Sequence, residues 1–276
     1  MAEIHVSIIL TTYNQSDLLL LILKALDCQT YKNFEVIVAD DGSADDTKQI
    51  VDNLSQSVSF PVQHVWHEDD GFRASEIRNK GALKSTGEYL IFLDGDCVPQ
   101  DDFIENHMKL SEPGWYVRGN RIMLSEKLTN RIRANKLQVH LWGNITWLSL
   151  WLRREVKRII PLLCFINYPY RKSKAAKWYG VKTCNLGIWR KDYFSVNGLD
   201  ETYQGWGRED SDLAIRLINS GIKRKEGIFA TAVFHFWHQD AEKDRLAHND
   251  GLLEQTIKEN RKRAVRGLDD HKAEAC

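Results

Sequence analysis

Short apolar runs and longer helical patterns alternate along the first 125 residues of the chain. Four strand-like runs cover residues 6–10, 34–38, 62–66 and 89–93, and the last, rich in Leu, Ile and Phe, is typical of a buried strand. Three helical patterns separate them, over residues 17–27, 47–54 and 74–85. This alternation predicts an α/β fold with a mainly parallel sheet, flanked by helices that form right-handed crossovers.

A similar pattern resumes after residue 181. Strand-like runs cover residues 183–189 and 228–235, and helical patterns cover residues 191–196 and 209–220. The polar stretch from 242 to 266 indicates a helix packed on the outside of the protein. We expect a single domain over residues 1–276, with halves at 1–125 and 181–240, an insert at 126–180 and a C-terminal helical tail at 241–276.

The insert has an unusual composition. Residues 130–178 contain eleven Lys or Arg and a single acid, Glu155. Four tryptophans lie among them: Trp142, Trp147, Trp151 and Trp178. A helix over 145–160 would separate large apolar side chains from basic ones, as at a membrane interface. The alternative is a basic helical insert that packs its tryptophans on the core. We expect no nucleic-acid partner, because no known reading motif accompanies the charges.

Overall composition narrows the remaining choices. Lys plus Arg equal Asp plus Glu, at 38 each, so net charge selects no partner. The five cysteines follow no paired or metal-ligand spacing, which fits reduced thiols. The first residues lack the basic flank and apolar core expected of a signal peptide, and no apolar run is long enough to cross a bilayer. We therefore expect a cytoplasmic location, with peripheral attachment to the cytoplasmic face of the inner membrane as the alternative.

Acidic residues follow two of the predicted strands. Asp94 and Asp96 come directly after the run at 89–93, and Asp40 and Asp41 end the second strand. In parallel sheets, ligands bind beyond the carboxyl ends of the strands. Carboxylates that converge there attract a hard divalent cation such as Mn²⁺ or Mg²⁺, bound together with a phosphate-bearing substrate. A second Asp-x-Asp, at 210–212, lies in a helical pattern where i and i+2 do not share a face.

The loop before the helix at 209–220 also carries candidate chemistry. Two glycines flank Trp206, so the backbone can turn tightly and expose an indole face of the kind that supports a sugar ring. Glu209 and Asp210 then occupy the first helical turn, where they either act on a ligand or only complement the helix dipole.

Cationic and imidazole groups complete the set. His235 and His238 follow an apolar strand and are predicted metal ligands or phosphate contacts, with His235 the first choice. Arg73, Arg78 and Lys80 lie on or just before a helix and suit contact with a diphosphate.

These segments together resemble the family 2 glycosyltransferases of the GT-A fold, which is Rossmann-like. The resembling segments are 7–14, 38–43, 78–81 and 93–96. The run 197–210 is similar to the Gly-Trp-Gly-x-Glu-Asp acceptor loop of β-1,4-galactosyltransferases and chondroitin-type polymerases. The resemblance covers most of 4–125 and 183–240. Arg208 stands where the galactosyltransferase loop usually has Gly, which bears on the sugar more than on the reaction class.

The resemblance implies a role for each matching position. The uracil and ribose of a UDP-sugar would be held by Thr11, Tyr13, Asn14 and one of Asp40 or Asp41, with Asp40 slightly favoured. Arg78 and Asn79 would approach the donor. Asp94 would contact ribose and metal, and Asp96 would bind the metal with His235 or His238. Trp206 and Glu209 would line the acceptor pocket, and Asp210 would be the general base.

The implied activity is inverting, Mn²⁺- or Mg²⁺-dependent transfer of a hexose or N-acetylhexosamine from a UDP-sugar to a hydroxyl group. The acceptor would be a glycan or a lipid-linked glycan, as in bacterial surface polysaccharide or lipopolysaccharide synthesis. A nucleotidyltransferase acting on sugar phosphates is one alternative, although residues 11–15 are not a Gly-rich phosphate loop. A glycoside hydrolase would not need the metal-ready strand end. A non-catalytic carbohydrate-binding relative would not need the clustered acids.

Overall fold

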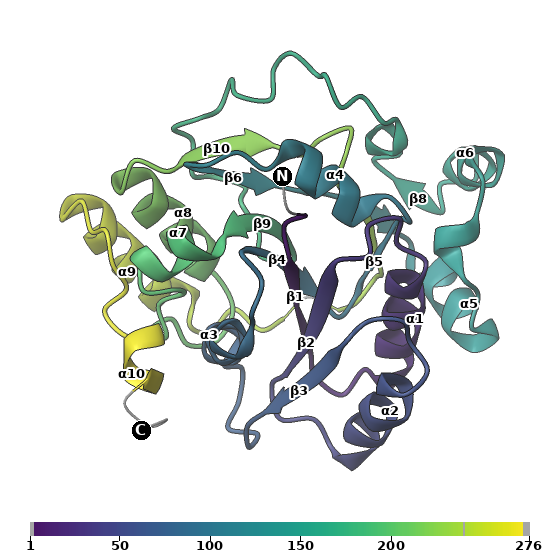
Figure 1. Ribbon diagram of the computed structural model, residues 1–276, viewed down its shortest axis with the longest axis horizontal. Coiled ribbons are helices and arrows are strands. Elements are labelled where there is room, and N and C mark those ends of the chain that lie inside the picture. Colours follow the sequence, from purple (N-terminus) through teal and green to yellow (C-terminus); the bar gives the residue numbers. More distant parts are fainter. Residues whose placement is uncertain (1–2, 240, 273–276) are drawn as a thin grey trace.

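A seven-stranded sheet runs through the computed structural model, which describes residues 3–239 and 241–272 (Figure 1). The strand order is β10-β6-β9-β4-β1-β2-β3. The strands are β1 (Val6–Thr12), β2 (Phe34–Asp40), β3 (Val62–Trp66), β4 (Tyr89–Asp94), β6 (Trp115–Arg118), β9 (Asn185–Trp189) and β10 (Lys223–Glu226). β1 to β4 pair in parallel, whereas β9 is antiparallel to β4 and β6. The predicted mainly parallel α/β sheet is confirmed.

The register of the parallel strands brings their carboxyl ends to one edge. Thr11 of β1 pairs with Asp94 of β4, and Thr12 pairs with Asp40 of β2. Because both neighbours of β1 end at the same level, the acids that follow them meet at this edge.

Helices cover both faces of the sheet because successive strand residues point to opposite sides. Ile8 and Leu10 of β1 pack in a core with α1 (Ser16–Asp27), whereas Ile9 packs in a second core with α3 (Ala74–Lys84). Figure 1 shows α1 and α2 on one side and α3, α7 and α8 on the other. The remaining helices named here are α2 (Asp45–Ser55), α4 (Phe103–Leu110), α7 (Arg190–Ser195) and α8 (Glu209–Asn219).

A second sheet of four strands, which the sequence did not predict, lies within the described residues. Its order is β5 (Cys97–Pro99), β11 (Ala232–His235), β7 (Asn120–Leu124) and β8 (Val156–Lys157). His235 pairs with Cys97, so the end of β11 lies directly beside the acidic turn. The strand expected over 228–235 is shorter, because hydrogen bonds from Ala230 and Thr231 to the Gly227 carbonyl form a turn there.

The insert departs from the helix expected over 145–160. It begins with α5 (Glu126–Asn135), and α6 (Asn144–Leu152) ends early because Arg154 and Arg158 adopt positive φ angles and β8 pairs with β7. Trp147 is buried and stacks on Phe234, with ring centroids 4.1 Å apart. One tryptophan of the insert therefore packs on the core.

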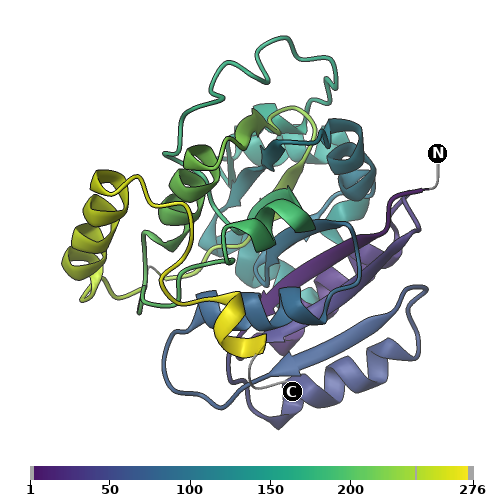
Figure 2. The same cartoon turned by 60° about the vertical axis from the view of Figure 1, so that its left-hand side comes forward.

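The C-terminal tail forms two helices instead of one. α9 (Leu246–Lys258) and α10 (Leu268–Lys272) are separated by an irregular segment (Figure 2). Leu268 is buried in the same core as Ile77 of α3. Within the described ranges, no helix combines the length and apolar character needed to span a membrane.

Candidate active site

Asp94 is held at the end of β4 by two neighbouring elements. Thr11 donates a 3.0 Å hydrogen bond to Asp94 Oδ1, and Arg78 Nη2 lies 2.7 Å from the same oxygen. Arg78 comes from α3 and is buried. Its Nη1 atom is enclosed but has no hydrogen-bond partner within the described part of the chain. An enclosed guanidinium nitrogen without a partner is costly unless a ligand accepts from it.

The turn from Asp94 to Asp96 requires glycine at its centre. A Cβ at Gly95 would lie 2.5 Å from the Thr11 carbonyl oxygen, closer than real contacts allow. The missing side chain lets the backbone of this turn lie against β1, which brings both carboxylates to the strand edge.

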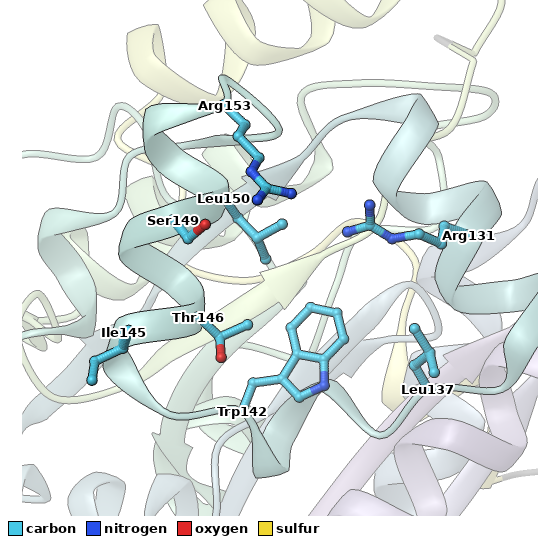
Figure 3. Close-up of a pocket in the computed structure, with 8 residues that line it drawn as sticks. All are labelled: Arg131, Leu137, Trp142, Ile145, Thr146, Ser149, Leu150 and Arg153. Carbon is cyan, nitrogen blue, oxygen red and sulfur yellow. The ribbon is translucent and has the colours of Figure 1, made fainter.

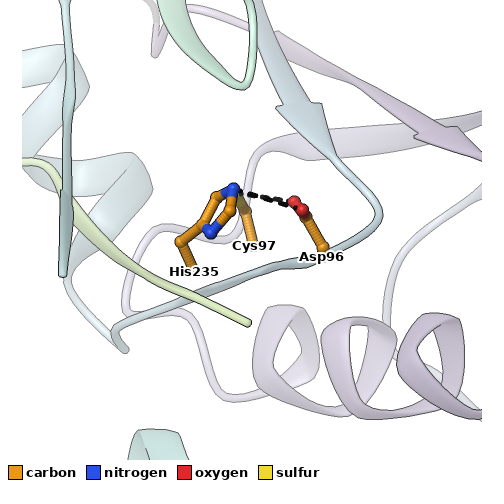
Figure 4. Close-up of side chains that lie close together, drawn as sticks. All are labelled: Asp96, Cys97 and His235. Atoms are coloured by element: carbon orange, nitrogen blue, oxygen red, sulfur yellow. Dashed lines mark hydrogen bonds and ion pairs between the residues drawn. The ribbon is translucent and has the colours of Figure 1, made fainter. Parts of the chain in front are cut away.

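Asp96 lies between the imidazoles of His235 and His238, and Figure 4 shows the contact with His235. Its Oδ2 atom is 3.2 Å from the Nε2 atoms of both His235 and His238, and Cys97 Sγ donates to its Oδ1. Burial opposes ionisation, but the His238 hydrogen bond and the charges of both histidines hold the pKa of Asp96 below its usual value. Burial lowers the pKa of His235, which favours the neutral, ligating imidazole.

These donor groups fit a divalent cation. Ligand atoms of Asp96, Cys97 and His235 all lie within 4.8 Å of one another. Burial raises the pKa of the Cys97 thiol well above its usual value, so a thiolate is disfavoured there. Carboxylate and imidazole remain, and both are ligands of divalent cations. The buried Nδ1 atom of His235 also has no hydrogen-bond partner among the residues described.

Asp40 and Asp41 are already bonded within the protein. Asp40 accepts from the Ser43 backbone N–H at 2.8 Å and lies 3.0 Å from His64 Nε2. Asp41 lies 2.7 Å from His67 Nε2 and accepts from the Arg73 backbone. Both carboxylates are buried, Asp40 completely. Each therefore braces the loop after β2, and the sequence had no signal for the two histidine partners.

Tyr13 and Asn14 lie on the loop after β1. The Tyr13 side chain is 47% exposed and its hydroxyl donates to Asp69 at 2.9 Å. Asn14 adopts a positive φ of 48° and accepts a hydrogen bond from the Ala44 backbone. Asn14 thus joins the loops after β1 and β2, and Tyr13 presents an aromatic ring beside them.

Asn79 faces away from the acids that Arg78 contacts. It is fully buried, and its amide donates to Leu199 O and Glu201 Oε1 and accepts from Tyr193 and the Leu199 N–H. These four bonds use the amide group completely. In this arrangement Asn79 anchors the segment that leads to the 205–210 loop.

The 205–210 loop turns as its glycines suggested. Gly205 and Gly207 have φ of 68° and 106°, and Arg208 follows at 81° as the residue before α8. Trp206 is 37% exposed, with Lys182 Nζ 5.7 Å and Lys243 Nζ 5.3 Å from its ring. The loop therefore presents an indole face flanked by cations.

Asp210 and Glu209 have different surroundings in the first turn of α8. Asp210 is buried, accepts a 2.9 Å hydrogen bond from the Thr183 N–H at Oδ1, and has Lys182 Nζ 3.5 Å from Oδ2. Burial and then the negative charge of Asp210 raise the pKa of Glu209 to about 7. The enclosed Oε2 of Glu209 has no hydrogen-bond partner in the described chain.

Arg78 joins the two acidic groups of the site. Burial opposes its charge, but Asp94, then Asp210, and then Glu209 raise its pKa. One guanidinium thus experiences the acids of β4 and of α8 together. The structure brings Asp94, Asp210 and Glu209 around a common cation, although they are far apart in the sequence.

Two basic residues near the site carried no sequence signal. Lys182 precedes β9 and reaches both Asp210 and Trp206. Arg121 lies in β7, where burial opposes its charge but neighbouring Cys184, Cys97, Asp94 and Asp96 raise its pKa. Each is a lone cation in an ordinary run, so only the tertiary structure reveals its position.

A separate pocket of about 460 Å³ lies away from these acids, in the insert (Figure 3). Its lining combines apolar and basic side chains from α5, α6 and the segment between them. Figure 3 shows the guanidinium groups of Arg131 and Arg153 above the indole of Trp142. Arg131 also lies 3.1 Å from Glu155.

Comparison with known protein families accounts for the fold and the acidic site. The profile described as glycosyl transferase family 2 matches residues 7–175, more than half of the chain. A second profile, described as the N-terminal domain of galactosyltransferase, matches residues 161–239. The chain therefore belongs to glycosyl transferase family 2 and is a transferase enzyme.

Individual relatives extend the comparison. Validoxylamine A glucosyltransferase of Streptomyces hygroscopicus subsp. jinggangensis is 28% identical over 229 residues, which cover 78% of this chain and 52% of that protein. Chondroitin synthase of Escherichia coli is 25% identical over 247 residues, covering 81% of this chain and 34% of the synthase. The chain thus spans about half or less of the length of these relatives.

Solved structures share the fold at low sequence identity. A mannosyltransferase of Pyrobaculum calidifontis in complex with GDP-Man and Mn²⁺ superposes with a TM-score of 0.58 and 18% identity, covering 85% of this chain and 57% of that one. GalNAc-T7 with UDP, GalNAc and Mn²⁺ gives a TM-score of 0.60 and 13% identity, covering 87% and 45%. These likenesses establish a GT-A-like fold.

Proposed function

We propose that this chain is an inverting, metal-dependent glycosyltransferase that moves a hexose or N-acetylhexosamine from a UDP-sugar to a glycan hydroxyl. The arrangement around Arg78 carries the proposal. Arg78 bonds to Asp94 at the strand edge, and the negative charges of Asp210 and Glu209 on α8 raise its pKa. Unpartnered polar atoms of Arg78 and Glu209 are enclosed there, as expected where a polar substrate binds.

The nucleotide would occupy the ends of β1 and β2. Tyr13 offers an exposed aromatic ring, while Thr11 and the loop braced by Asn14, Asp40 and Asp41 form the surrounding edge. Of the two acids at the end of β2, the fully buried Asp40 would support nucleotide binding indirectly, because it holds the backbone of the following loop in place. The neighbouring structures contain UDP in one case and GDP-Man in the other. The identity of the donor's nucleobase therefore needs a test.

Asp96 and His235 would hold Mn²⁺ or Mg²⁺, with Asp94 and His238 beside them. When bound, the cation supplies Lewis-acid stabilisation of the diphosphate leaving group. Asp94 keeps Arg78 oriented through the 2.7 Å contact, so a second positive charge is fixed near the donor. The neighbouring Mn²⁺-containing transferases support a divalent ion of this kind.

Asp210 would accept the proton of the attacking hydroxyl. The Thr183 N–H fixes Oδ1, and Oδ2, which lies 3.5 Å from Lys182 Nζ, would accept the proton. As the new bond to the sugar C1 forms, the old C1–O bond breaks and its electron pair remains on the diphosphate. One base and one displacement invert the anomeric centre. Trp206 and Glu209 would position the acceptor sugar beside this carboxylate.

Donor binding and turnover test the proposal. A thermal-shift screen of UDP-sugars, GDP-mannose and sugar 1-phosphates with Mn²⁺ should show stabilisation by one UDP-sugar, followed by slow release of UDP without acceptor. Stabilisation by GDP-mannose alone would show that the donor nucleotide contains guanine instead of uracil. Formation of a nucleotide-sugar from a sugar 1-phosphate would instead favour a nucleotidyltransferase, and binding without turnover a non-catalytic relative.

The insert supports a lipid-linked acceptor, held at an anionic membrane surface. Its exposed apolar side chains are Leu141, Ile145, Leu148, Trp151 and Leu152. Arg153 lies at the pocket beside them, and Arg154 and Lys157 are exposed nearby. Apolar side chains rimmed by basic ones match an anionic leaflet. Trp147 on Phe234 joins this surface to the strand that carries His235, so attachment would bring the acceptor near the site.

Sedimentation with vesicles tests the membrane contact. Vesicles containing anionic phospholipid should retain the protein at low salt and release it at high salt. Replacing Arg153 and Arg154 with Gln should weaken retention, whereas Arg263→Gln, an exposed residue paired with Asp269, should not. Equal binding to neutral vesicles would contradict an attachment that depends on anionic lipid, and no binding at low salt would reject the membrane contact. Neither result would affect the proposed donor site.

A further inference from the structure

Arg121 lies on the same face of the smaller sheet as the predicted metal ligands. In the parallel pairing of β7 with β11, Arg121 is opposite Val233 and Met123 is opposite His235. His235 is in turn opposite Cys97 of β5. Because side chains alternate along a strand, Arg121, His235 and Cys97 point to one face, while Ile122 and Phe234 are buried in the core on the other.

The charge of Arg121 is not used by a bond to any residue that the structure describes. Among the described residues, no hydrogen bond or ion pair of 4.0 Å or less includes its guanidinium, although it lies partly buried beside Asp94 and Asp96. Arg78 differs, because its Nη2 is committed to Asp94 at 2.7 Å. A partly buried guanidinium without a bonded partner is available to an anionic ligand.

We propose that Arg121 binds the distal phosphate of the nucleoside diphosphate. This inference rests on the proposed function and adds a residue to it. The nucleoside end belongs at β1 and β2, whereas Arg121 lies beyond the Asp94–Asp96 turn, on the side of His235. A diphosphate that extends from the first region across the acids therefore reaches Arg121 with its distal end. Negative charge grows on that phosphate when the bond to the sugar breaks.

Comparison of UDP with UMP tests this assignment, because only UDP has the distal phosphate. With Mn²⁺ present, Arg121→Met should weaken UDP binding at least about tenfold, the loss expected for a charge-assisted contact, and leave UMP within about twofold. Arg121→Lys should recover part of the UDP affinity. Arg133→Met, an exposed arginine paired with Asp17, is the matched control and should change neither.

Two results would overturn the inference. Equal weakening of UDP and UMP would show that Arg121 only supports the site, and unchanged UDP binding would show that it makes no contact. If Arg121→Met does not fold by circular dichroism, the UDP-to-UMP affinity ratio of Arg121→Lys decides the question, and a ratio equal to wild type would contradict the contact. Failure of the wild-type protein to bind UDP at all would instead reject the proposed function, and this inference with it.

Discussion

The Nη2 atom of Arg78 lies 2.7 Å from Oδ1 of Asp94, which ties helix α3 to the end of strand β4. Asp210, on α8, also raises the pKa of this arginine. Arg78 therefore bonds to the strand-edge acid Asp94 and lies within electrostatic range of the acids of α8. Without such a cation, three carboxylates would converge in a partly enclosed region at considerable electrostatic cost.

Glu209 should make stability depend on pH. Its pKa is raised from 4.5 to about 7, so the folded protein binds this proton more tightly than the unfolded chain does. That contribution is fully present below the unfolded pKa and is lost as pH rises through about 7. Glu209→Gln, measured by urea unfolding, should therefore lose less stability than wild type between pH 5 and pH 8, by on the order of 1–2 kcal/mol. Parallel pH profiles for the two proteins would contradict this.

The two histidines at Asp96 should contribute unequally to metal binding. His235 is buried on a strand, whereas His238 is 48% exposed at its side chain. Ordering the exposed side chain costs more entropy, so His235→Ala should weaken Mn²⁺ binding in the presence of UDP more than about tenfold, and His238→Ala less. Calorimetric titration measures this, with exposed His248→Ala as control. A larger loss for His238→Ala would assign the metal to that residue.

Gly95 should tolerate no side chain. A Cβ there meets the Thr11 carbonyl at 2.5 Å, so Gly95→Ala must displace backbone and should cost about 1–3 kcal/mol of stability, with loss of Mn²⁺ binding. Gly251→Ala is the control, since it lies within α9 with open space around it and should stabilise the protein by about 0.5–1 kcal/mol. Equal unfolding free energies for the two variants would refute the close contact.

Local sequence patterns were sufficient for the large sheet. The runs that became β1, β2 and β4 are apolar, so their burial and helical connections could be predicted, whereas β3 is a half-exposed strand at the edge of the sheet. The smaller sheet could not, because its strands are two to five residues long and pair Cys97 with His235 from distant parts of the chain. Helix α6 ended early because Arg154 and Arg158 adopt positive φ, which composition does not reveal.

The site shows the same division. Asp94 and Asp96 stood out because acids directly follow a buried strand, and the structure places them at the sheet edge as the sequence indicated. Asn79 gave no sign that Leu199 and Glu201 would occupy its amide. The position of Arg121 could not be predicted from the sequence either, since it depends on which face of β7 the side chain occupies. Motif position thus predicted where the chemistry would lie, and tertiary contacts show which of these residues are already bonded within the protein.

Paired measurements on Asp96→Asn and Asp210→Asn test the central claim most directly. UDP affinity with Mn²⁺ and the turnover of the donor are measured on wild type and both variants. Asp96→Asn should lose metal-dependent UDP affinity, because it removes a proposed metal ligand. Asp210→Asn should keep UDP affinity within about twofold while turnover falls about 10²–10⁴-fold, as expected for loss of a general base. Loss of UDP affinity in Asp210→Asn, or retained turnover in either variant, would contradict the account.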